Sequence, residues 1–204
     1  WIISDKKEIS RIQKLLKIFI ICILFFFSFK FNMSEAKKMV LDKLDNPGKT
    51  VQEQRWSFFT DGVMGGLSEG NAKISSIEGV PCYKMTGNVT TENNGGFIQI
   101  RTIINPLIKA EDYTGIYMKV FGNNKNYSIH IRTPLTLAPW QYYAHSFNAE
   151  NKWLEIKAPF VNFKKSNFYQ PRKLQNQHLR SIGLVAGFNN FFAEICLAEI
   201  GFYQ

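Results

Sequence analysis

Cysteine is scarce in this sequence: the 204 residues contain three cysteines, and no two of them form a Cys-X-X-Cys pair. Three cysteines are too few for a disulfide-stabilised miniprotein, and without the pair the commonest zinc-binding pattern is missing. The histidines, His130, His145 and His178, stand too far apart for a helical His-X-X-X-His zinc motif. No spacing of carboxylates suggests a general acid and base. The sequence therefore predicts no metal, no cofactor and no catalytic residues, and it does not support an enzyme.

Acidic residues are fewer than basic ones, with 16 Asp and Glu against 25 Lys and Arg and a net charge of +9. The basic excess is spread along the chain, and its tightest cluster in the body of the protein is Lys164-Lys165. Proteins that bind nucleic acids usually concentrate Lys and Arg on one helix or stripe. We therefore expect a solvated basic surface and no nucleic-acid partner.

A hydrophobic run long enough for a membrane-spanning helix is also missing. The ten apolar residues 18–27 fall short of the roughly 20 residues that a spanning helix needs. They do match the apolar segment of a secretory signal, and Ser34 and Ala36 have the small side chains that signal peptidase accepts. This pattern predicts a signal peptide over residues 1–36, cleavage after Ala36, and an exported, periplasmic or membrane-associated protein.

A second interpretation of the first residues stays open. Translation could begin at Met33, which would make the preceding residues an untranslated leader and the protein cytoplasmic. Ser34 would then cap a short helix with Met39, Val40 and Leu44 on its apolar side, which Asn46-Pro47-Gly48 would end. In either case we predict a linker with a short helix over residues 37–55 and one folded domain over residues 56–204.

Apolar and polar residues alternate through this domain. Tyr127, Ile129 and Ile131, for example, are separated by polar residues. A repeat of two places one side of a strand in the core and the other in water, as in antiparallel sheets. Turn-forming residues separate the runs, and no long amphipathic helix lies between them. The sequence predicts an all-β fold, an antiparallel β-sandwich of the jelly-roll type, with strands near residues 71–77, 81–90, 96–104, 115–121, 126–132, 141–148, 152–157, 181–187 and 191–203.

Two details of these strands carry further expectations. In the last strand the apolar side changes between Leu197 and Ile200, which a β-bulge near residues 198–199 would explain. Cys82 and Cys196 each lie in a predicted strand. We expect them to be buried thiols by default, and a bridge between them becomes possible if the protein is exported.

The glycine-rich segment 62–68 is the only stretch that suggests a phosphate loop. It lacks the Gly-Lys-Ser or Gly-Lys-Thr ending, and no apolar-periodic helix follows it. We interpret it as a tight turn that uses glycine for backbone angles other residues resist. An internal ion pair from Arg101 or Arg132 to Asp61 would fix that turn.

Polar and aromatic residues fall on the non-core side of three predicted strands. If these strands are neighbours, their side chains form a shallow recognition face; otherwise they are scattered residues on a solvated sheet. An arginine offers a forked donor to carboxylates or amides, and an exposed aromatic ring offers a flat surface for a sugar ring or a partner side chain. The candidate binding residues are Asp61, Gln99, Arg101, His130, Arg132, Trp140 and, of the pair Tyr142 and Tyr143, Tyr143.

Residues 56–70, with Trp56, Asp61 and the Gly65-Gly66 pair, resemble the opening signature of the complex I intermediate-associated protein family, the thirty-kilodalton assembly factors. Four more segments resemble the family in order, namely 94–101, 127–132, 147–160 and 182–200. The resemblance implies a galactose-binding-like jelly roll. It also implies a chaperone-like role, because mitochondrial members help to assemble NADH:ubiquinone oxidoreductase.

Most positions that carry the resemblance are expected to serve the fold, and Asp61, Arg101 and Arg132 could also serve a ligand. The expected structural positions are Trp56, Met64, Gly65, Gly66, Ser68, Asn94, Gly95, Gly96, Phe97, Tyr127, Trp153 and Pro159. The chain departs from the family pattern at Gly122-Asn123-Asn124, where a Gly-Asp-Gly turn is usual, and at Lys164-Lys165.

Three functions follow as hypotheses. The favoured one is a non-enzymatic domain that binds a protein partner, such as subunits of a membrane complex, and helps to assemble a respiratory complex. The alternative is a carbohydrate-binding module of an exported protein that uses Trp140, Tyr143, His130 and Arg132. The third is a hydrolase or lyase with an unrecognised site, which would require turnover that is lost in Arg132→Ala.

Overall fold

The structure is a computed structural model that describes residue 17, residues 37–174 and residues 177–204. The chain divides into two units, Trp1–Glu35 and Ala36–Gln204, and the second contains all the strands described below. The predicted signal peptide or leader over residues 1–36 lies outside the described residues, apart from Lys17. Among the residues described, no helix is both long enough and apolar enough to cross a membrane.

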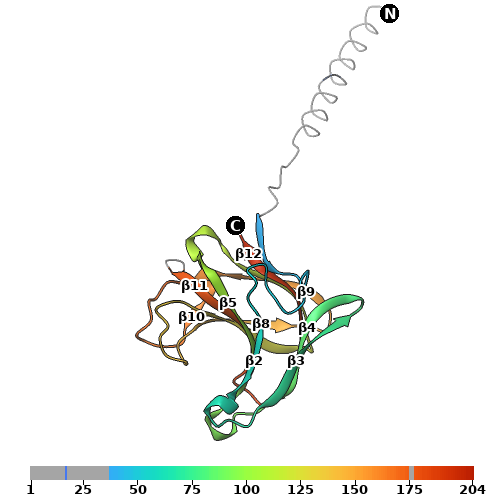
Figure 1. Cartoon of the computed structure of the whole chain (residues 1–204), viewed down its shortest axis with the longest axis vertical. Coiled ribbons are helices and arrows are strands. Elements are labelled where there is room, and N and C mark those ends of the chain that lie inside the picture. The colour runs from blue at the N-terminus through green and yellow to red at the C-terminus, as the bar shows by residue number, and fades with distance from the viewer. Residues whose placement is uncertain (1–16, 18–36, 175–176) are drawn as a thin grey trace, which may run out of the picture. The chain divides into compact units, whose positions relative to one another are not determined.

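Two antiparallel sheets make up the folded unit (Figure 1). The first sheet has the strand order β3-β4-β12-β6-β9, and β1 also pairs with β12. Its strands are β1 (Lys38–Asp42), β3 (Glu69–Ile77), β4 (Val80–Val89), β6 (Gly115–Phe121), β9 (Trp153–Pro159) and β12 (Phe191–Tyr203).

The second sheet has the strand order β10-β8-β7-β11-β5-β2. Its strands are β2 (Ser57–Thr60), β5 (Phe97–Lys109), β7 (Lys125–Arg132), β8 (Tyr143–Ala149), β10 (Lys164–Lys165) and β11 (His178–Gly187). Short 3-10 helices lie between strands: η1 (Asp61–Met64), η2 (Glu92–Asn94), η3 (Ala110–Asp112) and η4 (Phe160–Asn162). The predicted all-β antiparallel sandwich is confirmed.

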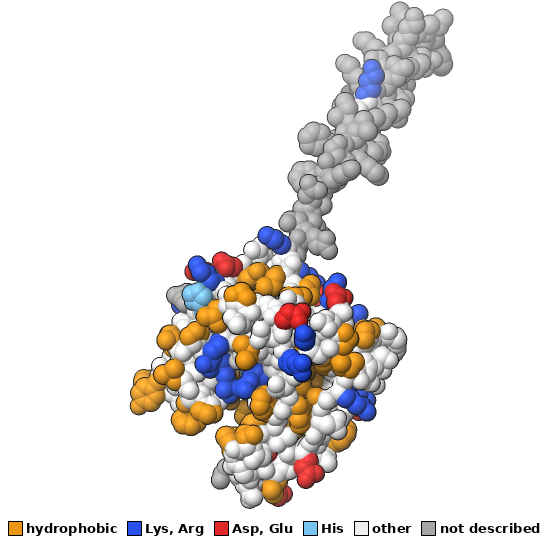
Figure 2. Space-filling view, viewed as in Figure 1, with side chains coloured by type: hydrophobic (Ala, Val, Ile, Leu, Met, Phe, Trp, Pro, Cys, Tyr) orange, Lys and Arg blue, Asp and Glu red, His pale blue; other side chains and the backbone are white. Residues whose placement is uncertain are grey.

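The core lies between the two sheets and follows the alternation in the sequence. Ile98 and Ile100 of β5 and Ile129 of β7 are buried on one side, and Met118 of β6 and Ile195 of β12 are buried on the other. Burial of apolar side chains supplies most of the favourable free energy of such a fold. Large hydrophobic side chains also remain on the surface, where Figure 2 shows them beside Lys and Arg side chains.

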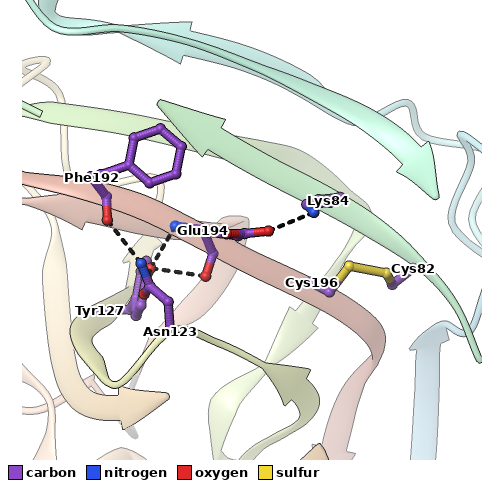
Figure 3. A network of polar contacts seen from close by, with 7 residues as sticks. All are labelled: Cys82, Lys84, Asn123, Tyr127, Phe192, Glu194 and Cys196. Atoms are coloured by element: carbon purple, nitrogen blue, oxygen red, sulfur yellow. Dashed lines mark hydrogen bonds and ion pairs between the residues drawn. A yellow bond between two sulfur atoms is a disulfide. The ribbon is translucent and has the colours of Figure 1, made fainter. Parts of the chain in front are cut away.

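Strand β12 contains the predicted bulge. Its pairing with β6 shifts register between Leu197 and Glu199, so the apolar side changes without leaving the core. The same strand is tied to the second sheet by Tyr127 of β7 (Figure 3). The Tyr127 hydroxyl accepts a hydrogen bond from the Glu194 amide (2.9 Å) and donates to the side-chain oxygen of Asn123 (2.7 Å).

Cys82 of β4 and Cys196 of β12 form a disulfide on the outer side of the first sheet (Figure 3). Their Cα atoms are 5.4 Å apart, and both residues are completely buried. Phe121 and Trp153 pack against the bridge and contact each other edge to face, with ring centroids 5.6 Å apart. The default expectation of buried free thiols is therefore wrong.

The apolar alternation in the sequence did not predict strands β1, β2 and β10. Where a short helix was expected within residues 37–55, the structure has strand β1, which pairs with the C-terminal half of β12 from Lys38 opposite Tyr203 to Asp42 opposite Ile200. The buried Asp42 carboxylate then accepts hydrogen bonds from Trp56 Nε1 (2.6 Å) and the Tyr83 hydroxyl (2.9 Å). These contacts anchor the segment to the sandwich, so it is part of the domain core.

Candidate binding face

Four predicted site residues lie together on the outer side of the second sheet. Along β5 and β7, Ile98, Ile100, Ile129 and Ile131 point into the core, so the residues between them point outward. The outward residues include Gln99 and Arg101 on β5 and His130 and Arg132 on β7.

The register of β11 brings these residues close to one another. Gly183 of β11 stands opposite Arg101 on one side and His130 on the other. Two strand spacings separate the latter two backbones, or about 10 Å. Since Gly183 has no side chain, the long side chains of its neighbours can occupy the space above it. We call the outward surface formed by Gln99, Arg101, His130, Arg132 and Arg180 the arginine face.

Arg180 belongs to this face, and the sequence analysis missed it. It precedes Ser181 at a register shift in β11, an irregularity that strand periodicity does not reveal. Its guanidinium donates a hydrogen bond to the carbonyl of Thr136 (3.2 Å), and the Arg132 guanidinium donates to the carbonyl of Pro139. Both arginines thus hold the loop over residues 133–142, which connects β7 to β8.

Neighbouring guanidinium charges lower the pKa of both Arg101 and Arg132. Partial burial, followed by the charges of Arg101 and Arg180, lowers the pKa of Arg132 to about 10. Partial burial and the charge of Arg180 lower the pKa of Arg101 below its ordinary value. At a pKa of about 10, Arg132 is protonated at neutral pH. The face is therefore a concentration of positive charge.

Aromatic rings lie beside the arginines. The rings of His130 and Tyr142 are stacked with centroids 4.0 Å apart and an interplanar angle of 11°. Phe188 lies 6.0 Å from the His130 ring, and the Arg101 guanidinium lies over the Phe59 ring, 4.7 Å from its centroid. Burial, with a smaller contribution from Arg132, lowers the pKa of His130 to about 3. His130 is therefore neutral near pH 7 and adds aromatic surface without charge.

Exposed hydrophobic side chains border the face at the end of β7 and the start of β8. The Ser166 hydroxyl donates to the Trp140 carbonyl (2.8 Å) and accepts from the Tyr142 amide (2.9 Å), which joins the 133–142 loop to the segment after β10. We call the exposed residues of these two segments the apolar rim. The apolar rim consists of Leu135, Leu137, Trp140, Phe168 and Tyr169.

Two predicted binding residues do not belong to the face. Tyr143 pairs with Ile131 and shares its inward side, so its ring is completely buried and its hydroxyl donates to the Pro171 carbonyl (2.7 Å). The side chain of the preceding residue, Tyr142, points to the outer side of the sheet and lies on the face, where its ring stacks on His130. Asp61 is also completely buried, and in the described part of the chain it has no ion pair with an arginine.

Asp61 instead organises the glycine-rich segments. Its carboxylate accepts hydrogen bonds from the Ser68 amide and hydroxyl (2.9 and 2.6 Å) and from the amides of Gly96 and Phe97. Burial alone would raise the pKa of Asp61, but these hydrogen bonds outweigh it and hold the pKa below the ordinary value. Gly65 has a φ of +84°, which agrees with the predicted tight turn.

The segment from Gly66 to Gly70 also has the Gly-X-Ser-X-Gly spacing of nucleophilic serines, a match that the sequence analysis missed. Ser68 is only 4% exposed, its hydroxyl is bound to Asp61, and a β-strand follows it in place of a helix. An exposed hydroxyl on a strand-to-helix turn is what that motif needs. This serine therefore supports the turn.

The other expected structural positions divide into buried and exposed ones. Tyr127 is buried, and Trp153 packs on the disulfide. Met64, in contrast, is 57% exposed. The side chain of Asn94 lies outside the described residues. Within residues 37–174 and 177–204, no three His, Cys, Asp or Glu side chains gather in a way that could hold a metal ion.

Comparison with known proteins assigns the chain to a family. The model of Complex I intermediate-associated protein 30 (CIA30) matches residues 45–194. The chain belongs to the CIA30 family. The matched residues include both glycine-rich segments around Asp61 and all six strands of the second sheet. Among curated proteins, no match was found.

Solved structures similar to this CIA30-family chain include carbohydrate-binding modules. One is a family 11 module from Clostridium thermocellum in complex with a β-1,3-1,4-mixed-linked tetrasaccharide, with a TM-score of 0.62 and 16% identity over 81% of this chain and 94% of that one. A second is the family 11 module of a cellulosomal cellulase of the same organism, with a TM-score of 0.62 and 15% identity over 84% and 97% of the two chains. At this identity the likeness shows a shared fold.

Proposed function

We propose that this domain is a non-catalytic binding domain that recognises a partner protein through the arginine face and its apolar rim. Membership of the CIA30 family supports the more specific role of assisting the assembly of a respiratory membrane complex, NADH:ubiquinone oxidoreductase. The observation that carries the proposal is that arginines, aromatic rings and exposed apolar side chains lie together on this one surface.

Three features of that surface support a protein partner. Arginine and aromatic residues are enriched in protein interfaces and supply most of their binding energy. Here three arginines lie among the rings of Phe59, Tyr142 and Phe188. Trp140 is 63% exposed and Leu137 is 84% exposed at the rim. Large apolar side chains that remain in water on one part of a surface are typical of interaction sites.

Capture of partners from native membranes tests the proposal. The tagged full chain, the double variant Leu137→Ser/Trp140→Ser and the control Ile74→Ser would be compared by quantitative mass spectrometry. Ile74 is 50% exposed on β3 of the first sheet, so its variant removes exposed apolar surface away from the rim. We expect the rim variant to lose membrane-complex subunits that the wild type and the control retain. Equal capture by all three proteins would contradict the proposal.

A carbohydrate-binding module is the second candidate. The exposed Trp140 ring and the Tyr142 ring stacked on His130 support it, because sugar rings pack on flat aromatic surfaces. Binding on a glycan array that disappears in Trp140→Ala would favour this function. If no glycan binds while membrane subunits are captured, the protein-binding function is favoured.

We also propose that the domain works in an oxidising compartment, as export would provide. The Cys82–Cys196 bond supports this, since disulfides persist in such compartments and are rare in the cytosol. The mature N-terminus, measured by mass spectrometry on protein from its own cell, tests the proposal. A start at Lys37 supports export, whereas a start at Met33 or Ser34 together with free thiols at both cysteines would contradict it.

A further inference from the structure

The two sheets differ sharply in charge. The six strands of the second sheet contain no Asp or Glu, while they contain Arg101, Lys109, Lys125, Arg132, Lys164, Lys165 and Arg180. The six strands of the first sheet are balanced, with five residues of each sign. The sheets therefore differ mainly in their acidic residues: the described strands of the second sheet have none to balance their basic residues. Figure 2 shows Lys and Arg side chains grouped among hydrophobic ones on one face of the molecule.

The connections beside the arginine face continue this pattern. The loop 133–142 and the residues 166–174, which carry the apolar rim, also lack acidic residues. In the sequence no Asp or Glu occurs between Asp112 and Glu150, or between Glu155 and Glu194. These segments therefore offer no carboxylate that could pair with the arginines of the face.

The arginines accordingly have no carboxylate partner among the described residues. All seven ion pairs of that part of the chain are made by lysines. Arg132 and Arg180 each donate to one backbone carbonyl, and the guanidinium of Arg101 contacts the Phe59 ring. A guanidinium has five N–H donors, so most donors of the three groups are left for a ligand.

We propose that the arginine face binds a carboxylate-rich segment of the partner protein, with Arg101, Arg132 and Arg180 as its donors. This inference rests on the proposed function and adds the chemistry of the segment recognised. The planar guanidinium fork matches a carboxylate with two parallel hydrogen bonds. Three arginines on adjacent strands can engage successive acidic side chains of one segment.

The surroundings favour a peptide over other polyanions. Nucleic acids are bound mainly by exposed Lys and Arg along the phosphate backbone, with salt-sensitive affinity. Here the three arginines are partly buried among aromatic rings, and an apolar rim adjoins them. On an acidic glycan chain, apolar side chains that could occupy the rim are missing. A protein segment supplies both carboxylates and apolar side chains.

Fluorescence anisotropy on the full chain tests the inference. The probe is a labelled peptide of about ten glutamates at low ionic strength, near 0.05 M, where screening is weak; the matched neutral probe is an oligoglutamine of the same length. Single-stranded DNA and polygalacturonate of equal charge serve as competing polyanions. The face variant is Arg101→Gln/Arg132→Gln/Arg180→Gln. The control variant, Lys73→Gln/Lys119→Gln/Lys157→Gln, removes three charges from the first sheet.

We expect the face variant to weaken binding of the glutamate peptide by about tenfold or more, since each charge-assisted hydrogen bond contributes on that scale. The control variant should stay within about twofold of the wild type, as charges distant from the face are screened. Oligoglutamine should not bind. Because Arg132 and Arg180 also hold the 133–142 loop, Arg101→Gln alone is the second variant; it removes a fork without breaking a hydrogen bond of the described fold, and about threefold or greater weakening is expected.

Three results would overturn the inference. Equal weakening in the face and control variants means that only net charge matters. Tighter, Arg101-dependent binding of DNA or polygalacturonate assigns the face to another class of macromolecule. Unchanged capture of membrane subunits by a folded face variant removes the inference and the part of the arginine face in recognition, while partner binding through the apolar rim stands. Arg101-dependent peptide binding without any captured subunit refutes the proposed function and supports the chemistry of the face.

Discussion

Asp61 is the residue on which both glycine-rich segments depend. Its carboxylate binds the hydroxyl and amide of Ser68 and the amides of Gly96 and Phe97, which lie on segments about thirty residues apart. The residue is completely buried, so no water can replace these hydrogen bonds if the carboxylate is lost. A charged group at this position is tolerated because every donor around it faces it.

Asp61→Asn should therefore lower the free energy of unfolding by about 2–4 kcal/mol, because an amide leaves buried donors unsatisfied. The effect has a defined pH dependence. The pKa of Asp61 is lowered in the folded state from the ordinary value of 3.8, so its stabilisation is present above that value and is lost as pH falls through the folded pKa. Denaturation curves of the wild type and the variant at pH 7 and below pH 3 measure the loss of stability and its dependence on pH. A gap between wild type and variant that does not narrow in acid would contradict this account.

The glycines around Asp61 are required for a steric reason. A Cβ on Gly66 would lie closer than 3.0 Å to the carboxyl group of Asp61, and a Cβ on Gly95 would meet the same group. Gly65, by contrast, has open space around it but a φ of +84°. Gly66 is thus required for its close approach to Asp61, and Gly65 for its left-handed backbone conformation.

Gly66→Ala should cost about 2–4 kcal/mol, because the carboxylate must move and its hydrogen bonds with it. Gly65→Ala is the matched control, with only the left-handed backbone penalty of about 1–2 kcal/mol. Urea denaturation of both variants gives the comparison. If Gly65→Ala were the more damaging change, the close packing of Gly66 on Asp61 would not be the reason for that glycine.

At the scale of elements, alternation located most strands but not the three short ones, β1, β2 and β10. Nine predicted strands correspond to β3–β9, β11 and β12, since a period of two survives wherever one side is buried. The five residues of β1 (Lys38–Asp42) are too few for that signal, and they are strand because β12 offers them an edge. That edge is created by residues about 160 positions away and cannot be inferred locally.

The site residues could be predicted where the sequence shows which side of a strand each residue faces. Gln99, Arg101, His130 and Arg132 lie between core isoleucines, so their outward direction follows from the sequence. Tyr142 and Tyr143 are adjacent and both apolar enough for the core, and only the pairing of Tyr143 with Ile131 decides between them. Arg180 was missed because the irregular register at Leu179 interrupts the pattern.

The disulfide is the covalent link between neighbouring strands β4 and β12. Cys82 and Cys196 are separated by 114 residues, so the bond restricts a large part of the unfolded chain. The double variant Cys82→Ala/Cys196→Ala should lower the free energy of unfolding by about 2–5 kcal/mol. Adding a reductant should destabilise the wild type by a similar amount and leave the variant unchanged. A reductant effect of equal size on both proteins would show that the bond does not cause the difference.

At the scale of the whole molecule, the charged residues are distributed unequally between the two sheets. The second sheet contains seven Lys and Arg and no acidic residue, while the first sheet is balanced. A domain with such a distribution should approach a negatively charged surface with the second sheet first, because long-range steering depends on the arrangement of charges as well as on their sum.

Cation-exchange chromatography measures this orientation without any partner. The face variant (Arg101, Arg132 and Arg180 to Gln) and the first-sheet variant (Lys73, Lys119 and Lys157 to Gln) have the same net charge. If the protein docks on the resin through the second sheet, the face variant should elute at clearly lower salt than the first-sheet variant, which should elute close to the wild type. Circular dichroism would first establish that both are folded. Elution of the two variants at the same salt concentration would mean that the molecule presents no preferred face, and the charge asymmetry of its sheets would have no role in long-range recognition.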